Sequence, residues 1–220
     1  METKEIKSIS KAAIRRMPLY LSLVKQQIAM GEKTLSSTFI AEKLNTEAIQ
    51  VRKDLAATGV VGQPRLGFCS EELAAAIERL LGWDNLQEAF LIGAGNLGSA
   101  LIGYEPFIEN GLNIVAAFDN DSDKIGTEIR GVKVLSIDRL ENLIGRMHIK
   151  LAILTVPVEV AQQTAERLVS DGIEAIWNFT PTKIIVPDEV IVERTDLAAG
   201  YAQISSRLAT KAQRKAAENG

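Results

Sequence analysis

The chain has 220 residues, of which 46% are hydrophobic and 24% are charged, and its formal net charge is -3. This length suits one large domain or two small ones, so extensive disorder is not expected. The single cysteine, Cys69, excludes an intramolecular disulfide and a Cys-x-x-Cys redox pair, and a Cys/His metal cluster cannot be drawn. We therefore predict an ordered protein without a metal site.

Charge is unevenly distributed along the chain. Residues 1–68 contain 11 Lys and Arg against 6 Asp and Glu, whereas the remainder contains 14 against 22. Such asymmetry suggests that the first part meets a polyanion, although chance clustering would produce the same numbers. The first seven residues alternate in charge, and no window of 18 residues is uncharged and apolar, so we expect a cytoplasmic protein without signal peptide or membrane span.

The first 82 residues have helical patterns separated by short turns. Residues 11–30 carry apolar positions at helical spacing, with Pro18 expected to separate a first turn from the main helix. Ser36 or Ser37 is expected to cap a second helix that runs to Leu44, because a hydroxyl there accepts from unpaired amides.

A third helix is expected from Glu47 to about Thr58, capped by Thr46, and residues 60–68 resemble a short hairpin. Three helices and a hairpin are the plan of a winged helix-turn-helix, followed here by one more amphipathic helix over residues 70–81.

In a helix-turn-helix the later helix enters the DNA major groove, and here it contains Gln50, Arg52 and Lys53. Glutamine suits adenine edges, while arginine and lysine suit guanine edges or phosphates. Arg65, in the hairpin loop, is expected at the DNA backbone or minor groove. An ordinary solvated helix face would show the same cations. The predicted DNA-binding residues are Ser36, Ser37, Gln50, Arg52, Lys53 and Arg65.

From residue 87 onward, short apolar runs alternate with helical patterns. We predict strands at residues 90–92, 113–118, 132–135, 151–155, 175–178 and 190–193. Strands alternating with helices imply a parallel sheet with right-handed crossovers. The fold class is therefore α/β, with a Rossmann dinucleotide-binding domain after the winged helix.

A glycine-rich segment follows the first of these strands: Gly93, Ala94, Gly95, Asn96, Leu97 and Gly98. Gly93 permits a tight turn, Gly95 lets the backbone approach a pyrophosphate, and Gly98 lets the helix pack on the sheet. Asp119 ends the next strand, where a carboxylate accepts from the adenosine ribose hydroxyls and repels a 2′-phosphate. The cofactor predicted is NAD(H), although a structural acid at a strand end is the simpler alternative for Asp119.

Two further loops follow strand ends and should border the nicotinamide half of the cofactor. They contain Thr155, Val156 and Pro157, and Asn178, Phe179 and Thr180. No catalytic residue is evident, because the only histidine, His148, precedes its strand and so lies at the wrong end of the sheet. We therefore predict that the protein is not an enzyme.

Several ordered segments resemble the Rex family of redox-sensing transcriptional repressors of bacteria. They are residues 13–20 (AIRRMPLY), 50–55 (QVRKDL), 93–98 (GAGNLG), 117–126 (AFDNDSDKIG), 153–157 (ILTVP) and 178–181 (NFTP). The resemblance implies a homodimer that binds operator DNA and releases it when NADH binds. It also brings Asn120 and Lys124 into the cofactor site.

The resemblance further implies that a C-terminal helix is swapped into the partner subunit, with Asp196 and Tyr104 paired as the redox switch. In this sequence Leu197, Tyr201, Ile204 and Leu208 do form one helical stripe, which Asp196 is placed to cap. The chain departs from the family at Ser22, where an arginine is usual, and in the segment that follows the recognition helix.

The predicted organisation is a winged-helix DNA-binding domain over residues 1–82, a Rossmann NAD(H)-binding domain over 87–194 and a C-terminal dimerisation helix over 195–220. Three other functions stay open at this point. They are a regulator or paralogue with altered or no DNA binding, a regulator that acts through protein partners, and an NAD-dependent oxidoreductase or CoA-binding subunit.

Overall fold

The structure, a computed structural model, describes residues 9–218, with side chains described up to residue 214. The alternating charges of the first seven residues lie outside this range. The chain divides into two compact units, Met1–Leu86 and Gln87–Gly220. Each unit has a hydrophobic core of its own, and each is described here by itself.

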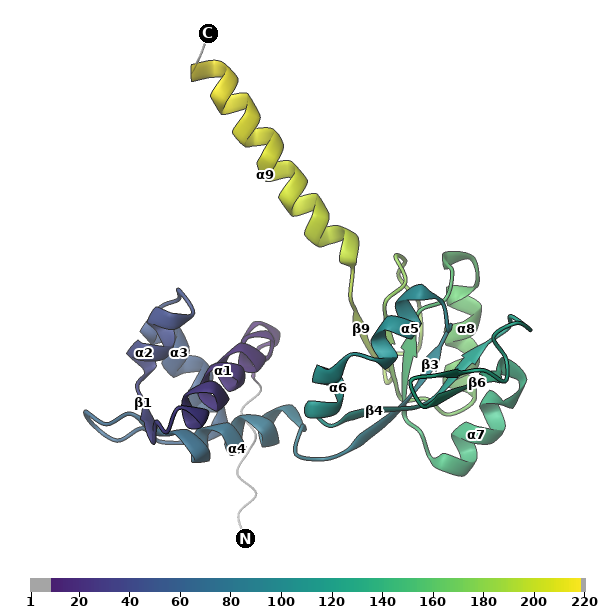
Figure 1. Cartoon of the computed structure of the whole chain (residues 1–220), viewed down its shortest axis with the longest axis horizontal. Helices are drawn as coiled ribbons and strands as arrows, with labels where there is room; N and C mark the ends of the chain where they lie inside the picture. The colour runs from purple at the N-terminus through teal and green to yellow at the C-terminus, as the bar shows by residue number, and fades with distance from the viewer. Residues whose placement is uncertain (1–8, 219–220) are drawn as a thin grey trace. The chain divides into compact units, whose positions relative to one another are not determined.

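The first unit is a small helical domain with one two-stranded sheet (Figure 1). Its elements are α1 (Lys11–Ala29), β1 (Thr34–Leu35), α2 (Ser37–Lys43), α3 (Ala48–Leu55), a 3-10 turn (Ala56–Thr58), β2 (Phe68–Cys69) and α4 (Ser70–Leu81). The core is filled from α1, α2, α3 and α4, with Met17, Tyr20, Ile40, Leu55 and Ile77 among its fully buried side chains. The predicted helix-turn-helix order is thus observed.

Helix α1 differs from the prediction at Pro18, which lies inside one continuous helix that Ser10 caps. Met17, Tyr20, Leu21 and Val24 are buried on one face that runs across the proline. Because burial of this stripe stabilises both halves of the helix, the hydrogen bond that proline cannot donate does not break it.

The capping predictions had mixed outcomes. The Ser36 hydroxyl accepts from the Phe39 amide at 3.0 Å, which confirms a cap at the start of α2. Helix α3, by contrast, starts after Glu47 without a side-chain cap, so the predicted Thr46 cap is wrong. Asn45, at φ 49°, turns the chain instead.

The predicted hairpin over residues 60–68 is also wrong in its pairing. Within this segment only a single bridge, Gln63 with Gly67, is formed, whereas β2 pairs antiparallel with the distant β1. The backbones meet so closely that a side chain at Gly67, which has φ 89°, would overlap the Leu35 carbonyl. The wing is therefore anchored at the start of the helix-turn-helix rather than by its own two strands.

The second unit is a parallel sheet covered by helices (Figure 1). Its elements are β3 (Gln87–Ile92), α5 (Asn96–Ile102), α6 (Glu105–Glu109), β4 (Leu112–Asp119), β5 (Glu128–Ile129), β6 (Val132–Ser136), a 3-10 turn (Ile137–Arg139), α7 (Leu140–Met147), β7 (Leu151–Leu154), α8 (Val158–Ser170), β8 (Ala175–Asn178), β9 (Ile191–Arg194) and α9 (Leu197–Glu218). All six predicted strands are present, and the short β5, which was not predicted, pairs antiparallel with β6.

The strand order is β5-β6-β4-β3-β7-β8-β9. Without the β5 appendage, this is the 3-2-1-4-5-6 order of the doubly wound dinucleotide fold. The order reverses between β3 and β7, and ligands of such sheets bind outside the carboxyl ends of the strands at that reversal. Since the glycine segment follows β3, the topology places it at the expected point.

Helix α9 completes the second unit and exposes an apolar stripe. Leu197, Tyr201, Ile204 and Leu208 are each at least 60% exposed. Asp196 caps the helix, since its Oδ1 accepts from the amides of Ala198 and Ala199 at 3.0 and 3.2 Å. The predicted helix and cap are confirmed, and its apolar side chains find no cover within the chain as described.

Candidate functional site

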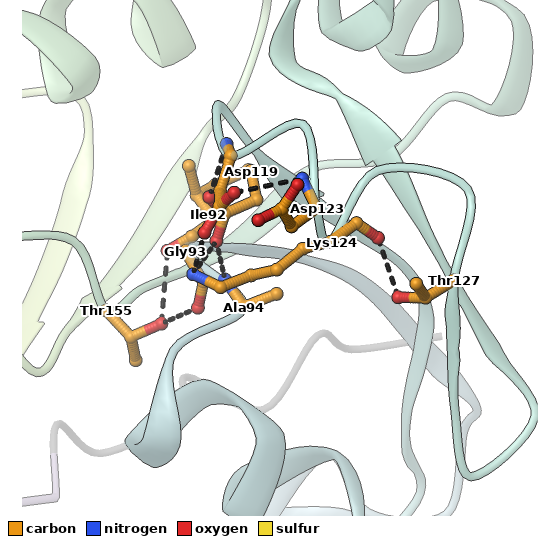
Figure 2. A network of polar contacts seen from close by, with 9 residues as sticks. Ile92, Gly93, Ala94, Asp119, Asp123, Lys124, Thr127 and Thr155 are labelled. Atoms are coloured by element: carbon orange, nitrogen blue, oxygen red, sulfur yellow. Dashed lines mark hydrogen bonds and ion pairs between the residues drawn. The ribbon is translucent and has the colours of Figure 1, made fainter.

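The turn after β3 is shaped by contacts that only glycine permits. Gly93 has φ 99°, and a Cβ there would lie 2.8 Å from the Thr155 carbonyl oxygen. The Thr155 hydroxyl donates to the carbonyls of Gly93 at 2.7 Å and Ile92 at 3.1 Å (Figure 2). A Cβ on Gly98 would overlap the Gly93 carbonyl. These contacts fix the ends of β3 and β7 side by side.

Gly95 is different, because a Cβ added there meets nothing within 4 Å and its φ of -78° suits any residue. Neither the packing nor the backbone of the protein therefore requires glycine at this position. Space left free beside the glycine turn is what close approach of a ligand backbone needs. The site fits a bound pyrophosphate on this observation.

Asp119 stands at the end of β4, beside this turn (Figure 2). Its Oδ2 accepts from the Ala94 amide at 2.8 Å and from Lys124 Nζ at 3.3 Å, and its Oδ1 accepts from the Asp121 amide at 2.9 Å. A carboxylate has about four acceptor positions, so roughly one stays open and a shift of Lys124 would free a second. Two such positions match the two hydroxyls of a ribose.

Burial by itself would raise the pKa of Asp119, but the hydrogen bonds from the Asp121 and Ala94 amides and from Lys124 outweigh it. The pKa of Asp119 is therefore lowered, and the group is an anion and pure acceptor at neutral pH. Lys124 also lies 3.4 Å from Asp121, and its own pKa is raised by the Asp119 partnership. A phosphate beside Asp119 and Asp121 would meet two negative charges.

A cleft of about 880 Å³ opens at this point of the sheet. Its volume lies in the usual range for a ligand pocket. Eight of the predicted cofactor residues line it: Gly93, Gly95, Asp119, Asn120, Lys124, Thr155, Val156 and Pro157. The reversal point of the sheet thus gathers side chains from three separate stretches of sequence.

Sequence reasoning missed one wall of the cleft, which comes from α8. Gln163, Thr164 and Arg167 line it from this helix, together with Ile137 and Val160. Their spacing of i, i+1 and i+4 marks one helical face directly after the Thr155 to Pro157 loop, and that was the available signal.

The remaining predicted cofactor residues do not line the cleft. Ala94 and Gly98 are buried in the glycine turn, and Asn96 and Leu97 begin α5. Asn178 and Thr180 are buried, and the Asn178 oxygen accepts from the Thr180 amide and hydroxyl at 2.9 and 2.6 Å. These two side chains shape the loop after β8, so a direct contact of theirs with a cofactor stays a prediction.

Phe179 belongs to a row of four aromatic rings. Its centroid lies 4.9 Å from that of Trp177, which lies 5.2 Å from Phe107, which in turn lies 5.0 Å from Tyr104. The Trp177 indole N–H donates to the Thr195 hydroxyl at 2.8 Å. The row therefore connects the loop after β8 with α6 and with the residue that precedes Asp196.

The two predicted switch residues are not paired with each other within the chain. Tyr104 is 51% exposed and packs edge-on against Phe107. The Asp196 carboxylate receives a hydrogen bond from Arg194 at 2.6 Å, which the sequence did not reveal as a partner. Ser22, which stands where an arginine is usual in the resembling family, is exposed and carries no charge that could pair with Asp196. An ion pair for Asp196 is thus supplied by β9.

In the first unit, the predicted nucleic-acid residues divide into two groups. Arg52 and Lys53 are exposed on α3, and Arg65 is exposed with φ 66° in the wing. Ser36 is engaged as the cap of α2, and Ser37 is the first residue of that helix. The exposed cations give this face the charge that a phosphate backbone requires.

Gln50 is half-buried and bonded to Asp54, a side chain that the sequence did not single out. The Asp54 carboxylate accepts from Arg16 Nε at 2.6 Å and Nη2 at 2.8 Å, from the Tyr20 hydroxyl at 2.8 Å and from Gln50 Nε2 at 2.8 Å. Asp54 is 3% exposed. Burial alone would raise its pKa, but these bonds, that from Arg16 first, lower it.

Within residues 9–218, no helix combines the length and hydropathy that crossing a bilayer demands. The same residues contain no group of three or more His, Cys, Asp or Glu side chains placed to hold a metal ion.

Two family descriptions match parts of the chain. "Putative DNA-binding protein N-terminus" matches residues 8–56, and "CoA binding domain" matches residues 84–182. The first match lies within the first unit, and the second covers most of the second unit. The second match agrees with a nucleotide-binding sheet.

Curated relatives match over most of the chain. A redox-sensing transcriptional repressor Rex of Treponema denticola is 50% identical over 90% of this chain and 95% of its own length. The Rex protein of Bacteroides fragilis is 37% identical over 94% of each chain.

Solved structures agree with these relatives. A crystal structure of RSP in complex with beta-NAD+ and operator DNA has a TM-score of 0.89 at 37% identity, covering 97% of this chain and 99% of its own. RSP in complex with beta-NADH has a TM-score of 0.83 at 38% identity, covering 95% of this chain and 99% of its own. Both units of the chain therefore have counterparts in one solved protein.

Proposed function

Because the chain belongs to the Rex family of redox-sensing transcriptional repressors, we propose that it binds operator DNA and releases it when NADH occupies the cleft beside Asp119. One observation carries this proposal: the same chain contains a helix-turn-helix with exposed cations and a nucleotide-type sheet. At the point where the strand order of that sheet reverses, Asp119 can accept hydrogen bonds from a ribose. A likeness to RSP, solved with operator DNA and with beta-NADH, supports both halves.

Asp119, the glycine turn and Lys124 would hold the adenosine ribose and pyrophosphate of NAD(H). The nicotinamide would supply the redox state that is sensed. The charges of Asp119 and Asp121 disfavour the 2′-phosphate of NADP(H). Ala94 and Asn120 would lie beside the ribose, and Phe179 and Thr155 would border the nicotinamide.

The residues that line the cleft suit a regulatory protein better than an enzyme. Within the described chain, the residues that line the cleft include no histidine, tyrosine or cysteine to move the proton that accompanies hydride transfer. The one lysine there, Lys124, is ion-paired with Asp119 and Asp121. On these grounds we infer a sensor rather than an enzyme, and the likeness to transcriptional repressors supports a cytoplasmic location.

The exposed stripe of α9 supports a homodimer. Large apolar side chains exposed in a row mark an interaction surface. In the dimer the stripe packs on a second copy as a swapped helix, and Asp196 approaches Tyr104 of the partner subunit. Light scattering then gives twice the mass of one chain, and Leu208→Glu, a charge on the stripe, gives a smaller species.

A titration of the protein–DNA complex tests the proposed function. A duplex selected by the protein from a random library is bound at low salt, and NADH and NAD+ are added in parallel. We expect release by NADH and little by NAD+, with a 5- to 150-fold change in affinity for a typical coupling of roughly 1–3 kcal/mol. If duplex binding does not change when NADH is added, the proposed sensing function is wrong. If duplex affinity does not fall as the salt concentration is raised, the proposed DNA-binding function is wrong.

Two variants separate the halves of the proposal. The double substitution Arg52→Ala and Lys53→Ala is expected to abolish duplex binding and to leave NADH affinity intact. Gly95→Ala is expected to weaken NADH binding and to leave duplex binding intact. Its methyl group has room in the protein but would occupy the space of the ligand. Loss of both activities in either variant indicates misfolding, which circular dichroism would show.

A further inference from the structure

The recognition helix of the first unit has a buried anchor at Asp54. The carboxylate takes four hydrogen bonds: two from Arg16 and one from Tyr20 on α1, and one from Gln50 on α3. Four bonds use all the acceptor positions that a carboxylate has. Asp54 therefore ties α3 to α1 and leaves no capacity for another donor.

This saturation determines the orientation of the Gln50 amide. The oxygen and nitrogen of an amide are usually assigned from their hydrogen-bond partners. An ionised carboxylate only accepts, so it is the nitrogen of Gln50 that faces Asp54. The lowered pKa of Asp54, caused mainly by Arg16 against the opposing effect of burial, keeps the group ionised at neutral pH. The amide is thereby prevented from turning over.

A fixed amide presents a fixed pattern to its surroundings. One N–H of Gln50 is used by Asp54, which leaves the oxygen as an acceptor and the second N–H as a donor. Among residues 9–214, no group donates a hydrogen bond to the Gln50 oxygen. An acceptor beside a donor complements the N6 donor and N7 acceptor of adenine in the major groove.

We propose that Asp54 is a positioning residue for base recognition, which holds the Gln50 amide in the orientation that reads an adenine. Asp54 itself touches no base and acts only through Gln50. The inference rests on the proposed function, since it requires that α3 enters the major groove.

The test measures binding of the full-length protein to a set of duplexes in which each base pair of the selected site is changed in turn. Gln50→Ala is expected to lose discrimination at one A·T pair, where the wild-type protein prefers adenine by at least about fivefold. Asp54→Asn is expected to lose discrimination at the same pair. The asparagine N–H2 attracts the Gln50 oxygen, so the amide turns over and its outward pattern is reversed. Combined with Gln50→Ala, Asp54→Asn should cause no further loss there.

The control is Glu78→Gln, which breaks the 2.7 Å ion pair between Glu78 on α4 and Lys25 on α1, neither of which belongs to α3. It should leave every preference unchanged. If Asp54→Asn weakens binding to all duplexes equally, its role is structural and the proposal is overturned. The same holds if Gln50→Ala changes no preference. A wild-type protein that binds no duplex refutes the proposed function instead, and the base-reading role with it.

A second measurement does not depend on the folding of Asp54→Asn. In the NMR spectrum of the free wild-type protein, the side-chain amide of Gln50 is identified by its loss in Gln50→Ala. We expect one of its two protons to exchange with water several-fold more slowly than those of the exposed Gln63. Equal exchange in the two glutamines would show that Asp54 does not hold the amide, and would overturn the proposal.

Discussion

Asp54 in the first unit and Asp119 in the second are both carboxylates whose pKa is lowered despite burial, yet they differ in how completely they are bonded. Asp54 has four donors, three of the four from α1, and is enclosed. Asp119 has two backbone amides and a half-exposed lysine, and it borders a cleft.

The difference teaches how the same side chain serves two purposes. A saturated carboxylate can only hold its surroundings in place, whereas one with an open acceptor can also bind a ligand. The donors differ accordingly, because side chains from another helix lock elements together, while backbone amides of the adjoining loops leave the outer lone pairs accessible. Three predictions follow from this contrast.

The largest expected effect is on the stability of the first unit. Asp54→Ala strips Arg16, Tyr20 and Gln50 of their common acceptor and should lower the free energy of unfolding of this unit by about 3–5 kcal/mol. Asp119→Ala should cost the second unit only about 1–2 kcal/mol, since it affects mainly two amides. Trp83 belongs to the first core and Trp177 to the second. Urea unfolding followed by fluorescence therefore reports the first unit in a Trp177→Phe background and the second unit in a Trp83→Phe background. Equal losses in the free energy of unfolding would show that the two carboxylates do not differ in structural importance.

The next effect is on cofactor affinity. Asp119→Asn keeps the size of the side chain but removes its charge, so NADH affinity should fall by about 10- to 100-fold, the value of a charged hydrogen bond. Preference for NADH over NADPH should fall as well. Asp54→Asn is the control, and in a calorimetric titration it should change neither the affinity for NADH nor the preference for NADH over NADPH. A loss of NADH affinity there would mean that the first unit takes part in the cofactor site.

The smallest effect concerns alkaline pH. Burial, and next the hydrogen bond to Asp54, raise the pKa of Tyr20 to about 12, against about 10 when unfolded. A raised pKa in the folded state means that the neutral phenol is favoured there, so its contribution is complete below pH 10 and is lost as the pH rises towards 12. About 1 kcal/mol should be lost by pH 11. In Tyr20→Phe, the free energy of unfolding measured with urea should no longer fall between pH 10 and pH 12 because of this group. If the same fall persists in the variant, another group causes it.

The sequence predicted the sheet well because its strands are buried on both faces and appear as continuous apolar runs, as at Leu151–Leu154. Glu128–Ile129 lacks such a run and was missed. The wing was mispredicted because its pairing with Thr34–Leu35 depends on a contact distant in sequence. Local residue types indicate a turn there but not its partner.

For the sites, sequence found what motifs encode and missed what tertiary packing brings in. The glycine turn and Asp119 lie in one motif, so they were predicted together. Arg167 enters the cleft from α8, the helix between β7 and β8, and Arg16 meets Asp54 across 38 residues. The helical spacing along α8 offered a signal for Arg167 that was not used, whereas the separation of Arg16 and Asp54 matches no recognisable pattern. The roles of the site residues stay predictions for the experiments above.

The junction ahead of α9 has a mechanical consequence. Thr195 is held twice, by its amide to the Asn178 carbonyl at 2.9 Å and by its hydroxyl to the Trp177 indole. The 22-residue helix that follows is about 33 Å long, so a rotation of roughly 10° at Thr195 displaces its far end by about 6 Å. The start of the helix is thus attached to the last two residues of β8, and a small rotation there is amplified along the helix. Changes too small to alter the sheet can become displacements as large as a full helical turn.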